Sequence, residues 1–403
     1  MDTQNTPIHV TLWHKDFWML AFANMLLSMS AYMLIPMIPP HMMKLGYDPL
    51  ITATAMGVFG IGVFLFGPLI NWYVQKYRRN RVCIRAMLFM AITVALMYYL
   101  EVYSHSQLDV FVLIVDRLMM GAFYGLAKMI LCGTLIIDKC ESFQRTEANH
   151  VMSWFGRFAL AIGPVASLPI SQFWGFGYTL VASGICILGA IILVEAVSFP
   201  FKAPDDDLKR FSLDRFFLLR GMPLFFILVL VAAVVGILFA LPMADRFFGM
   251  MMFGFLIALL AEKYVFADAN LKSETITGLI MIMVALLLLV TRDMPIVRSI
   301  APVFIGFGVG IIGSRFLLFF IKLAGHCQRG TSQSTHFLGW ELGMNLGLFV
   351  GIVMWPKNVS QLTGNAMRTI INEHYLIGIS VCLFVLLLYN FIIHSWYMRN
   401  KNR

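Results

Sequence analysis

Several ionisable side chains of this 403-residue sequence lie inside long apolar stretches, where a charge is costly. Glu341 and Asn345 are four residues apart and would share one face of a helix. A carboxyl group that helices and lipid remove from water resists ionisation, so it can load and release a proton near neutral pH. Glu341 is therefore the candidate proton carrier. The alternative is a fixed salt bridge from Glu341 to Arg315 or Arg157.

Bases outnumber acids inside the apolar stretches. The bases are Arg117, Lys128, Arg157 and Arg315, and the acids are Asp116, Glu195 and Glu341. Asp116 would point about 100° away from Arg117 around a helix, so another helix should supply the partner of Arg117. Arg117, Gly121 and Lys128 would form a stripe on one face. The excess of bases favours an anionic or zwitterionic amphipathic substrate, and buried structural ion pairs are the alternative.

Polar residues of the first apolar stretch are candidates to line a cavity. They are Asn24, Ser28, Ser30 and Tyr32, and Pro36, Pro39 and Pro40 should loosen the end of the same stretch. Ordinary helix packing explains the polar residues almost as well. The 28 Met and 35 Phe residues would suit an adaptable pocket, but we expect most of them to face lipid.

These residues need a membrane-spanning scaffold to position them. Hydrophobic residues make up 60% of the chain and charged residues 13%, which is typical of a polytopic membrane protein. The apolar stretches do not alternate as barrel strands would, and each approaches the ~20 residues that a helix needs to cross the bilayer. The twelve predicted helices cover residues 17–39, 50–73, 83–103, 109–133, 149–171, 177–199, 222–243, 247–266, 275–291, 297–321, 334–355 and 374–397.

The Lys and Arg distribution predicts cytoplasmic termini in the cytoplasmic (inner) membrane, because basic loops stay on the cytoplasmic side. With that orientation, 20 of the 30 Lys and Arg residues lie inside and six outside. The outer six are Lys44, Arg246, Arg292, Arg298, Lys357 and Arg368. The net charge of +9 thus reflects topology, and nucleic-acid binding is not implied. We expect no disulfide framework, metal site or cofactor, and we place His150, His326 and His336 at the inner surface.

A charged stretch at residues 201–221 divides the chain into two halves, residues 1–200 and 222–403, each with six predicted helices. We interpret it as a cytoplasmic linker. The halves also echo each other, because Gln-Arg precedes a His-x-x-x-Trp pattern at His150 and Trp154 and again at His336 and Trp340. This echo favours a six-plus-six duplication. A chance match is the alternative.

Three motifs resemble those of the major facilitator superfamily, and the resemblance covers essentially the whole chain. The loop with Gly67, Asn71, Arg78 and Arg79 is similar to a gating loop of that family, with Asn71 where an Asp is expected. An anchoring role for the basic residues is the alternative. Arg117 matches an Arg-x-x-Gln-Gly signature in which Met120 replaces the Gln, and Gly163-Pro164 resembles an antiporter motif.

The resemblance implies an all-α transmembrane fold of twelve helices in two six-helix bundles, closest in character to bacterial drug and metabolite exporters. We expect a monomeric secondary transporter, not an enzyme, that contacts lipid and moves a small solute by alternating access, with export coupled to protons. A proton-coupled importer of a sugar or organic acid is one alternative. A membrane-embedded enzyme or lipid-handling protein on the same scaffold is another. The chain contains no Gly-x-x-x-x-Gly-Lys-Ser/Thr loop, so ATP-driven pumping is unsupported.

Overall fold

Helices make up the architecture of the chain. The computed structural model describes residues 11–103, 110–199, 209–266, 270–325, 328–357 and 364–402, and these residues contain no strand. The α-helices are α1 (Lys15–Tyr32), α2 (Ile38–Lys44), α3 (Pro49–Gly62), α4 (Ile70–Lys76), α5 (Arg79–Tyr103), α6 (Val110–Ile130), α7 (Ile136–Asp138), α8 (Arg145–Trp174), α9 (Phe176–Glu195), α10 (Met222–Phe239), α11 (Asp245–Tyr264), α12 (Leu271–Thr291), α13 (Pro295–Leu323), α14 (Arg329–Val353), α15 (Gly364–Leu388) and α16 (His394–Asn400). A π-helical turn, η2 (Leu131–Leu135), joins α6 to α7.

All twelve predicted stretches are helical. Within the described residues, eleven helical segments are long and apolar enough to cross a membrane. The first predicted stretch is divided between α1 and α2, because α1 ends at Tyr32, ahead of Pro36, and Pro39 lies in the first turn of α2. The last stretch begins at Gly364 rather than at residue 374, so α15 carries polar turns that the apolar pattern does not predict.

Side-chain caps fix where two of the helices begin. Nδ1 of His14 accepts a hydrogen bond from the backbone N–H of Phe17 at 3.3 Å at the start of α1. Asp48 precedes α3, and its Oδ1 accepts from the N–H of Leu50 at 3.1 Å. Pro49 is the first residue of α3, where its missing N–H costs nothing. These caps stop the chain at defined points between successive helices.

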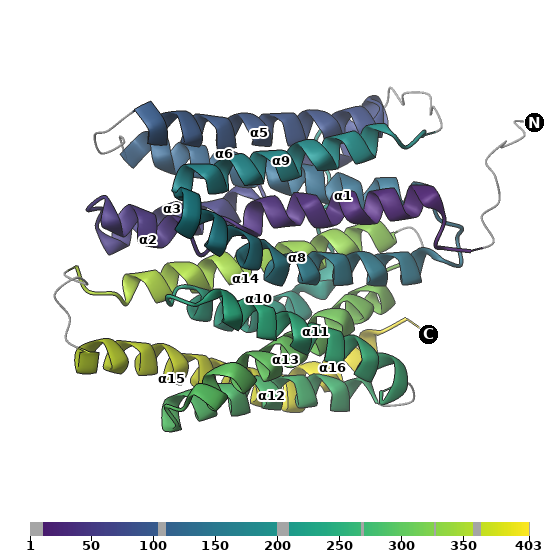
Figure 1. The fold of residues 1–403 in the computed structure, drawn as a ribbon. Helices are drawn as coiled ribbons and strands as arrows, with labels where there is room; N and C mark the ends of the chain where they lie inside the picture. Colours follow the sequence, from purple (N-terminus) through teal and green to yellow (C-terminus); the bar gives the residue numbers. More distant parts are fainter. Residues whose placement is uncertain are drawn as a thin grey trace, which may run out of the picture.

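The helices run side by side in one bundle, and the start of α1 and the end of α16 lie at the same end of it (Figure 1). We call this the inner end, following the predicted topology, and the opposite end the outer end. Helices α1 to α9 lie together, as do α10 to α16 (Figure 1). The two sets meet where α14 packs on α3 and where α11 and α13 pack on α8. The site therefore lies between sets of helices that come from different parts of the sequence.

The described part of the proposed linker contacts both sets of helices. The N–H of Ser212 donates to the carbonyl of Pro68 at 3.0 Å, and the N–H of Leu218 donates to Oγ1 of Thr335 at 2.8 Å. The ring of Phe216 lies where a side chain on Gly67 would project. Residues 200–208 are outside the described residues, so the division of the chain at 201–221 stays a prediction.

Candidate functional site

A small cavity of about 50 Å³ lies between helices of the two sets. Its walls come from α1, α6 with η2, and α8 on one side and from α14 on the other. The lining residues are Tyr32, Lys128, Cys132, Met152, Ser153, Gly156, Arg157, Gln333, His336, Phe337 and Trp340. This volume holds a few water molecules but no organic solute, since even one water needs about 10–15 Å³.

Glu341 lies fully buried in α14, one residue beyond the cavity wall at Trp340. Its Oε1 accepts a hydrogen bond from the hydroxyl of Tyr32 at 2.6 Å and a longer one from the hydroxyl of Tyr124 at 3.4 Å. Its Oε2 is buried and has no hydrogen-bond partner among the described residues. Both tyrosines belong to the other set of helices, so the carboxyl group joins the two sets at the centre of the protein.

Lys128 projects from α6 toward α1. Its ammonium group donates to Oδ1 of Asn24 and to the hydroxyl of Ser28. Nδ2 of Asn24 donates in turn to the carbonyl of Met152 in α8 at 3.0 Å. Lys128 is buried and forms no ion pair with any described residue. Its charge is thus held by neutral oxygen atoms, close to the cavity that it lines.

Arg157 is the second cation of the cavity. Its Nη2 donates to the hydroxyl of Ser153 at 2.7 Å, and its guanidinium carbon lies 4.8 Å from the centre of the Trp154 ring. It packs against Gly313, where an added side chain would overlap the guanidinium. Nη1 of Arg157 is buried and finds no partner in the described part of the chain. A donor on Arg157 and an acceptor on Glu341 are therefore both unsatisfied near the cavity.

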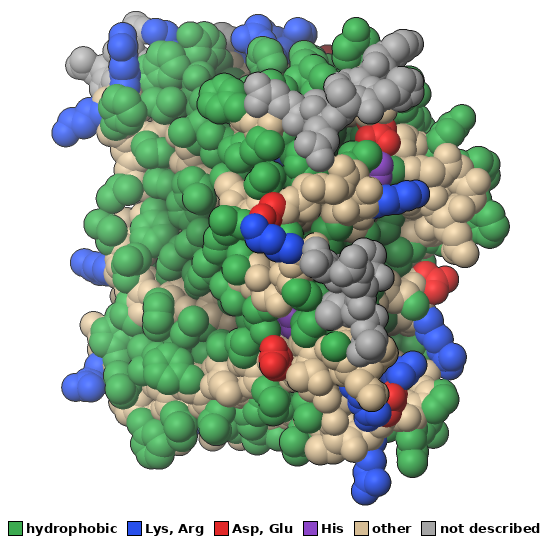
Figure 2. All heavy atoms as spheres, turned by 90° about the vertical axis from the view of Figure 1, so that its left-hand side faces the viewer, with side chains coloured by type: hydrophobic (Ala, Val, Ile, Leu, Met, Phe, Trp, Pro, Cys, Tyr) green, Lys and Arg blue, Asp and Glu red, His purple; other side chains and the backbone are tan. Residues whose placement is uncertain are grey.

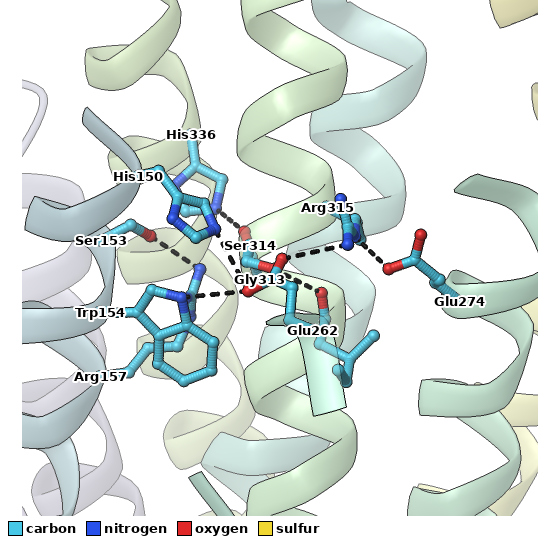
Figure 3. Close-up of polar contacts among 11 residues, drawn as sticks. His150, Ser153, Trp154, Arg157, Glu262, Glu274, Gly313, Ser314, Arg315 and His336 are labelled. Atoms are coloured by element: carbon cyan, nitrogen blue, oxygen red, sulfur yellow. Dashed lines mark hydrogen bonds and ion pairs between the residues drawn. The ribbon is translucent and has the colours of Figure 1, made fainter. Parts of the chain in front are cut away.

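A chain of polar contacts joins the two sets of helices near the inner end (Figure 3). Nε2 of His150 and Nε1 of Trp154, both in α8, each lie 3.2 Å from Oε2 of Glu262 in α11. We call these three residues the inner joint. Oε1 of Glu262 accepts from the Ser314 hydroxyl at 2.5 Å and lies 3.4 Å from Nη2 of Arg315. Further contacts then run from Arg315 into the second set of helices.

Arg315 and Glu274 continue this chain away from the cavity. The two side chains form an ion pair between α13 and α12, and the Glu274 side chain is 1% exposed (Figure 3). The sequence-based alternative that Arg315 pairs with Glu341 is therefore wrong, because Glu262 and Glu274 occupy both sides of its guanidinium. Arg157 does not pair with Glu341 either. Glu341 instead contacts tyrosine hydroxyls.

Two backbones also meet at the inner end. Gly133 lies in η2 and Gly330 in the first turn of α14, and a Cβ on Gly330 would come 2.5 Å from the carbonyl oxygen of Gly133. Nη1 of Arg329 donates to the carbonyl of Ser142 at 3.2 Å nearby. With the inner joint, these contacts hold the inner ends of the two sets together.

At the outer end, one ion pair joins the two sets. Nζ of Lys357, after α14, lies 2.7 Å from Oδ2 of Asp48, before α3. The hydrogen bond from Lys357 holds the pKa of the Asp48 carboxyl below its ordinary value, and the same bond and charge raise the pKa of Lys357. Both groups are solvent-exposed, so salt screens this contact more strongly than the buried ones.

Two of the predicted site residues lie away from the cavity. Arg117 is buried between α6 and α3, with its guanidinium carbon 4.9 Å from the centre of the Phe59 ring and its Nε 3.4 Å from the carbonyl of Ala55. Neither carboxylate oxygen of Asp116 has a hydrogen-bond partner among the described residues. Arg117 faces α3 while Lys128 faces α1, so the predicted stripe does not form one continuous surface.

The motif residues take local packing roles. Oδ1 of Asn71 accepts from Gln75 within α4 at 2.8 Å, and Nη1 of Arg79 lies 2.6 Å from Oδ1 of Asp138 at the end of α7. Arg78 lies between α4 and α5. Gly163 and Pro164 lie inside α8, where a Cβ on Gly163 would come 3.1 Å from the backbone nitrogen of Met33. The last motif therefore lets α8 approach the end of α1 closely.

Asn345 and the histidines complete the predicted set. Nδ2 of Asn345 donates to the carbonyl of Glu341 at 2.8 Å, within α14. His336 is buried and lies 2.9 Å from the carbonyl of Gly313, so its placement at the inner surface was wrong. His326 is outside the described residues. The described residues contain no group of three or more His, Cys, Asp or Glu that could hold a metal ion.

A helical bundle with a buried polar cavity between two sets of helices is the architecture of a secondary transporter. The family model described as "Major Facilitator Superfamily" matches residues 20–348. Since this match spans more than half of the chain, the chain belongs to the Major Facilitator Superfamily. It is thus a multi-pass membrane transporter of small solutes, not an enzyme, with an all-helical fold of about 11–13 membrane-spanning helices.

Solved structures with the same fold have very different sequences. The chain is similar to an auto-inhibited POT family peptide transporter, with a TM-score of 0.65, 13% identity and coverage of 97% of this chain and 98% of that one. It is also similar to the POT family transporter PepTSo (0.66, 12%, 96% and 98%) and to the nucleoside transporter NupG (0.65, 12%, 93% and 98%). No curated protein matches the chain. At these identities the structures show the fold alone, and the resemblance to drug and metabolite exporters stays a prediction.

Proposed function

We propose that the chain exports a small anionic or zwitterionic amphipathic solute in exchange for protons, and that Glu341 carries the proton. The observation that supports this most is the contact of Glu341 with Tyr32 and Tyr124, because one carboxyl group on α14 meets hydroxyl groups on α1 and α6. A group that both titrates and bridges the two sets of helices can link proton binding to their separation.

The chemistry of that contact gives the coupling a direction. A hydroxyl group donates a stronger hydrogen bond to a carboxylate than to a neutral carboxyl group. Protonation of Glu341 therefore weakens the bonds from Tyr32 and Tyr124, and it favours the state in which α14 moves away from α1 and α6. Loss of the proton restores the bonds and favours closure.

The charges around the cavity support the substrate class. Lys128 and Arg157 are cations without an acidic partner among the described residues, and Nη1 of Arg157 has no acceptor. Oε2 of Glu341 has no donor. A solute with an anionic group and a hydrogen-bond donor would satisfy both atoms, while Phe337 and Trp340 would cover its apolar part. The similar solved structures carry peptides and nucleosides, which also combine donors, acceptors and apolar surface.

The contacts at the two ends support alternating access. The inner joint and the approach of Gly133 to Gly330 close the inner end, and the Asp48–Lys357 pair joins the sets at the outer end. Since the cavity is too small for a solute, these contacts must break in turn to admit one.

Uptake is the second candidate, and one observation favours it. The described inner end is held closed, whereas a hollow of about 430 Å³ opens at the outer end between Pro36, Pro39, Phe239 and Trp355. An outward-facing entrance suits capture from outside. The Gly163-Pro164 motif favours export instead. A lipid-handling role, the monomeric state, the inner-membrane location and the cytoplasmic termini stay predictions.

The experiment begins with a thermal-shift screen of purified protein against amino acids, small peptides, nucleosides and organic acids. Flux of the stabilising compound is then measured in proteoliposomes with a pH gradient of either sign, for wild type and Glu341→Gln. We expect the variant to lose pH-driven flux while keeping solute exchange without a gradient, because Gln keeps the shape but cannot titrate. The sign of the gradient that drives uptake into the vesicles separates export from import.

Glu195→Gln is the matched control, since Glu195 is exposed at the end of α9. It removes the same charge away from the cavity and should transport like wild type. Undiminished pH-driven flux in a folded Glu341→Gln variant would exclude Glu341 as the proton carrier.

A further inference from the structure

Four arginines from distant parts of the sequence line one large hollow at the outer end. The hollow measures about 730 Å³ and lies between the α10–α11 loop, the α12–α13 loop and the first turns of α15. The arginines are Arg246, Arg292, Arg298 and Arg368. Figure 2 looks onto this end of the protein, and in its lower part blue side chains gather beside red ones.

The positive charge of this arginine hollow is poorly compensated. Asp293 is the one acidic residue among those that line it, and it pairs with Arg298 and, at 3.6 Å, with Arg368. Arg246 and Arg292 form no ion pair with the described residues. Four guanidinium groups thus face one carboxylate, and two of them are available to a ligand. Guanidinium groups match carboxylate and phosphate oxygens in pairs.

The same hollow also offers apolar surface. Phe247, Leu289, Met367 and Ile371 line it, together with Ser299, Asn365 and Asn372. The turns of α15 before residue 374, which the apolar pattern missed, supply part of this wall. The volume falls within the ~300–1,000 Å³ of ordinary small-molecule sites. A ligand with an anionic group and an apolar body would therefore fit both surfaces.

The placement of the outer cations is the unusual observation. Outer loops of membrane proteins are poor in Lys and Arg, and orientation needs none of them there. Of the six outer cations, four line the arginine hollow, and the other two, Lys44 and Lys357, line the hollow of about 430 Å³ beside it. Pro242 and Met367 belong to both hollows. Topology alone does not explain this convergence.

We propose that the arginine hollow is a binding site for an amphipathic organic anion that carries a carboxylate or phosphate group. The site is separate from the central cavity and does not depend on the direction or coupling of transport. The anion could be a free solute from the outer aqueous phase or the headgroup of an anionic lipid, and the two sources are distinguished below.

The first arm measures binding of phenyl phosphate to the purified full chain by calorimetry at low and physiological salt. We expect Arg246→Gln with Arg292→Gln to raise the apparent Kd about tenfold or more, because each arginine offers charge-assisted hydrogen bonds. Asp293→Asn should act in the opposite direction and lower the Kd, since it frees Arg298 and Arg368. The two signs together separate a site from a folding defect.

The second arm compares melting temperatures in nanodiscs of phosphatidylglycerol and phosphatidylcholine. Stabilisation by phosphatidylglycerol that the Arg246/Arg292 variant loses, without phenyl phosphate binding, supports the site with lipid as its occupant. Arg399→Gln with Lys401→Gln is the matched control, because it removes two exposed charges at the inner end. The proposal is overturned if neither probe acts on wild type, or if this control weakens binding as much as the Arg246/Arg292 variant.

Discussion

The approach of Gly330 to Gly133 makes closure of the inner end sensitive to a single methyl group. A Cβ on Gly330 would lie 2.5 Å from the carbonyl oxygen of Gly133, which is closer than real Cβ atoms come to an oxygen. The two glycines belong to different sets of helices, so the clash arises when the inner ends meet and disappears when they separate. Gly330→Ala should therefore favour an open inner end.

The size of the shift follows from the packing. Overpacking a tight contact costs about 1–3 kcal/mol. If this cost falls on the closed state, the ratio of open to closed states rises roughly 5- to 150-fold. Alanine is also the better helix former by up to about 1 kcal/mol, but that preference acts in both states and cancels from their ratio.

Cys132 provides the readout. It lines the central cavity and is 4% exposed, so a membrane-impermeant maleimide reaches it when an end of the bundle opens. The assay uses a background in which the other five cysteines are serine. Gly330→Ala should speed the labelling of Cys132 by the factor given above.

Two matched glycines test the reasoning. Gly133→Ala places a Cβ 3.4 Å from the carbonyl of Gly330, an ordinary contact, so labelling of Cys132 should change little. Gly62→Ala overlaps the carbonyl of Leu118, but both residues belong to the first set, so it should lower the melting temperature without faster labelling. Wild-type labelling of a folded Gly330→Ala protein would refute a closed inner end held by this contact.

Two further perturbations act on contacts between the sets of helices. Glu262→Gln should speed labelling of the cavity cysteine about tenfold or more, because hydrogen bonds to charged groups contribute ~1.5–3 kcal/mol; Glu274→Gln, whose ion pair stays within the second set, should destabilise the protein without this effect, and equal effects of the two would contradict the joint. At the outer end, the pKa of Asp48 is lowered and that of Lys357 raised, so their contact is fully present between the ordinary values of ~3.9 and ~10.4. It is lost as pH falls through the lowered Asp48 value or rises through the raised Lys357 value, so labelling of a cysteine placed at Met43 should increase at both extremes, and Asp48→Asn, which keeps the helix cap, should remove this pH dependence.

The helices were largely predictable, because length and apolarity alone decide which segments can cross a bilayer. All twelve predicted stretches are helical. The errors lie where polar residues continue a helix beyond the lipid, as in the turns of α15 from Gly364, or where prolines interrupt one, as after Tyr32. Hydropathy reports the solvent around a segment, and these departures depend on packing and backbone geometry instead.

The candidate site was predictable in its membership but not in its pairings. Tyr32 and Glu341 were both candidates, and the structure brings them to 2.6 Å; Asn24 and Lys128 also meet. Which charges pair depends on the rotation of each helix about its axis and on its neighbours, and neither is encoded in one segment. Arg117 shows the limit, since its surroundings are a carbonyl, a ring and two methionine sulfurs from α3 and α6.

Glu262 and Glu274 escaped the sequence reasoning for a definite reason. They lie at the ends of apolar stretches beside Lys263 and Lys272, so they read as parts of inner loops. A signal was nevertheless present, because the apolar stretches held more bases than acids, and a buried guanidinium such as that of Arg315 requires a partner. Searching the ends of neighbouring stretches for that partner would have found both acids.

These two acids change the electrostatic argument about the substrate. The sequence inventory counted four bases, but Arg315 is neutralised by Glu262 and Glu274, and Arg117 is enclosed between helices. The charges left at the cavity are Lys128, Arg157 and Glu341. When Glu341 is protonated, the cavity carries an excess of positive charge and should hold an anionic group most tightly. When Glu341 loses its proton, a zwitterionic solute would match the cavity, with its anionic group near Arg157 and its donor toward Oε2 of Glu341. Proton and solute would then compete for the same oxygen atom, which is the physical requirement for exchange of one against the other.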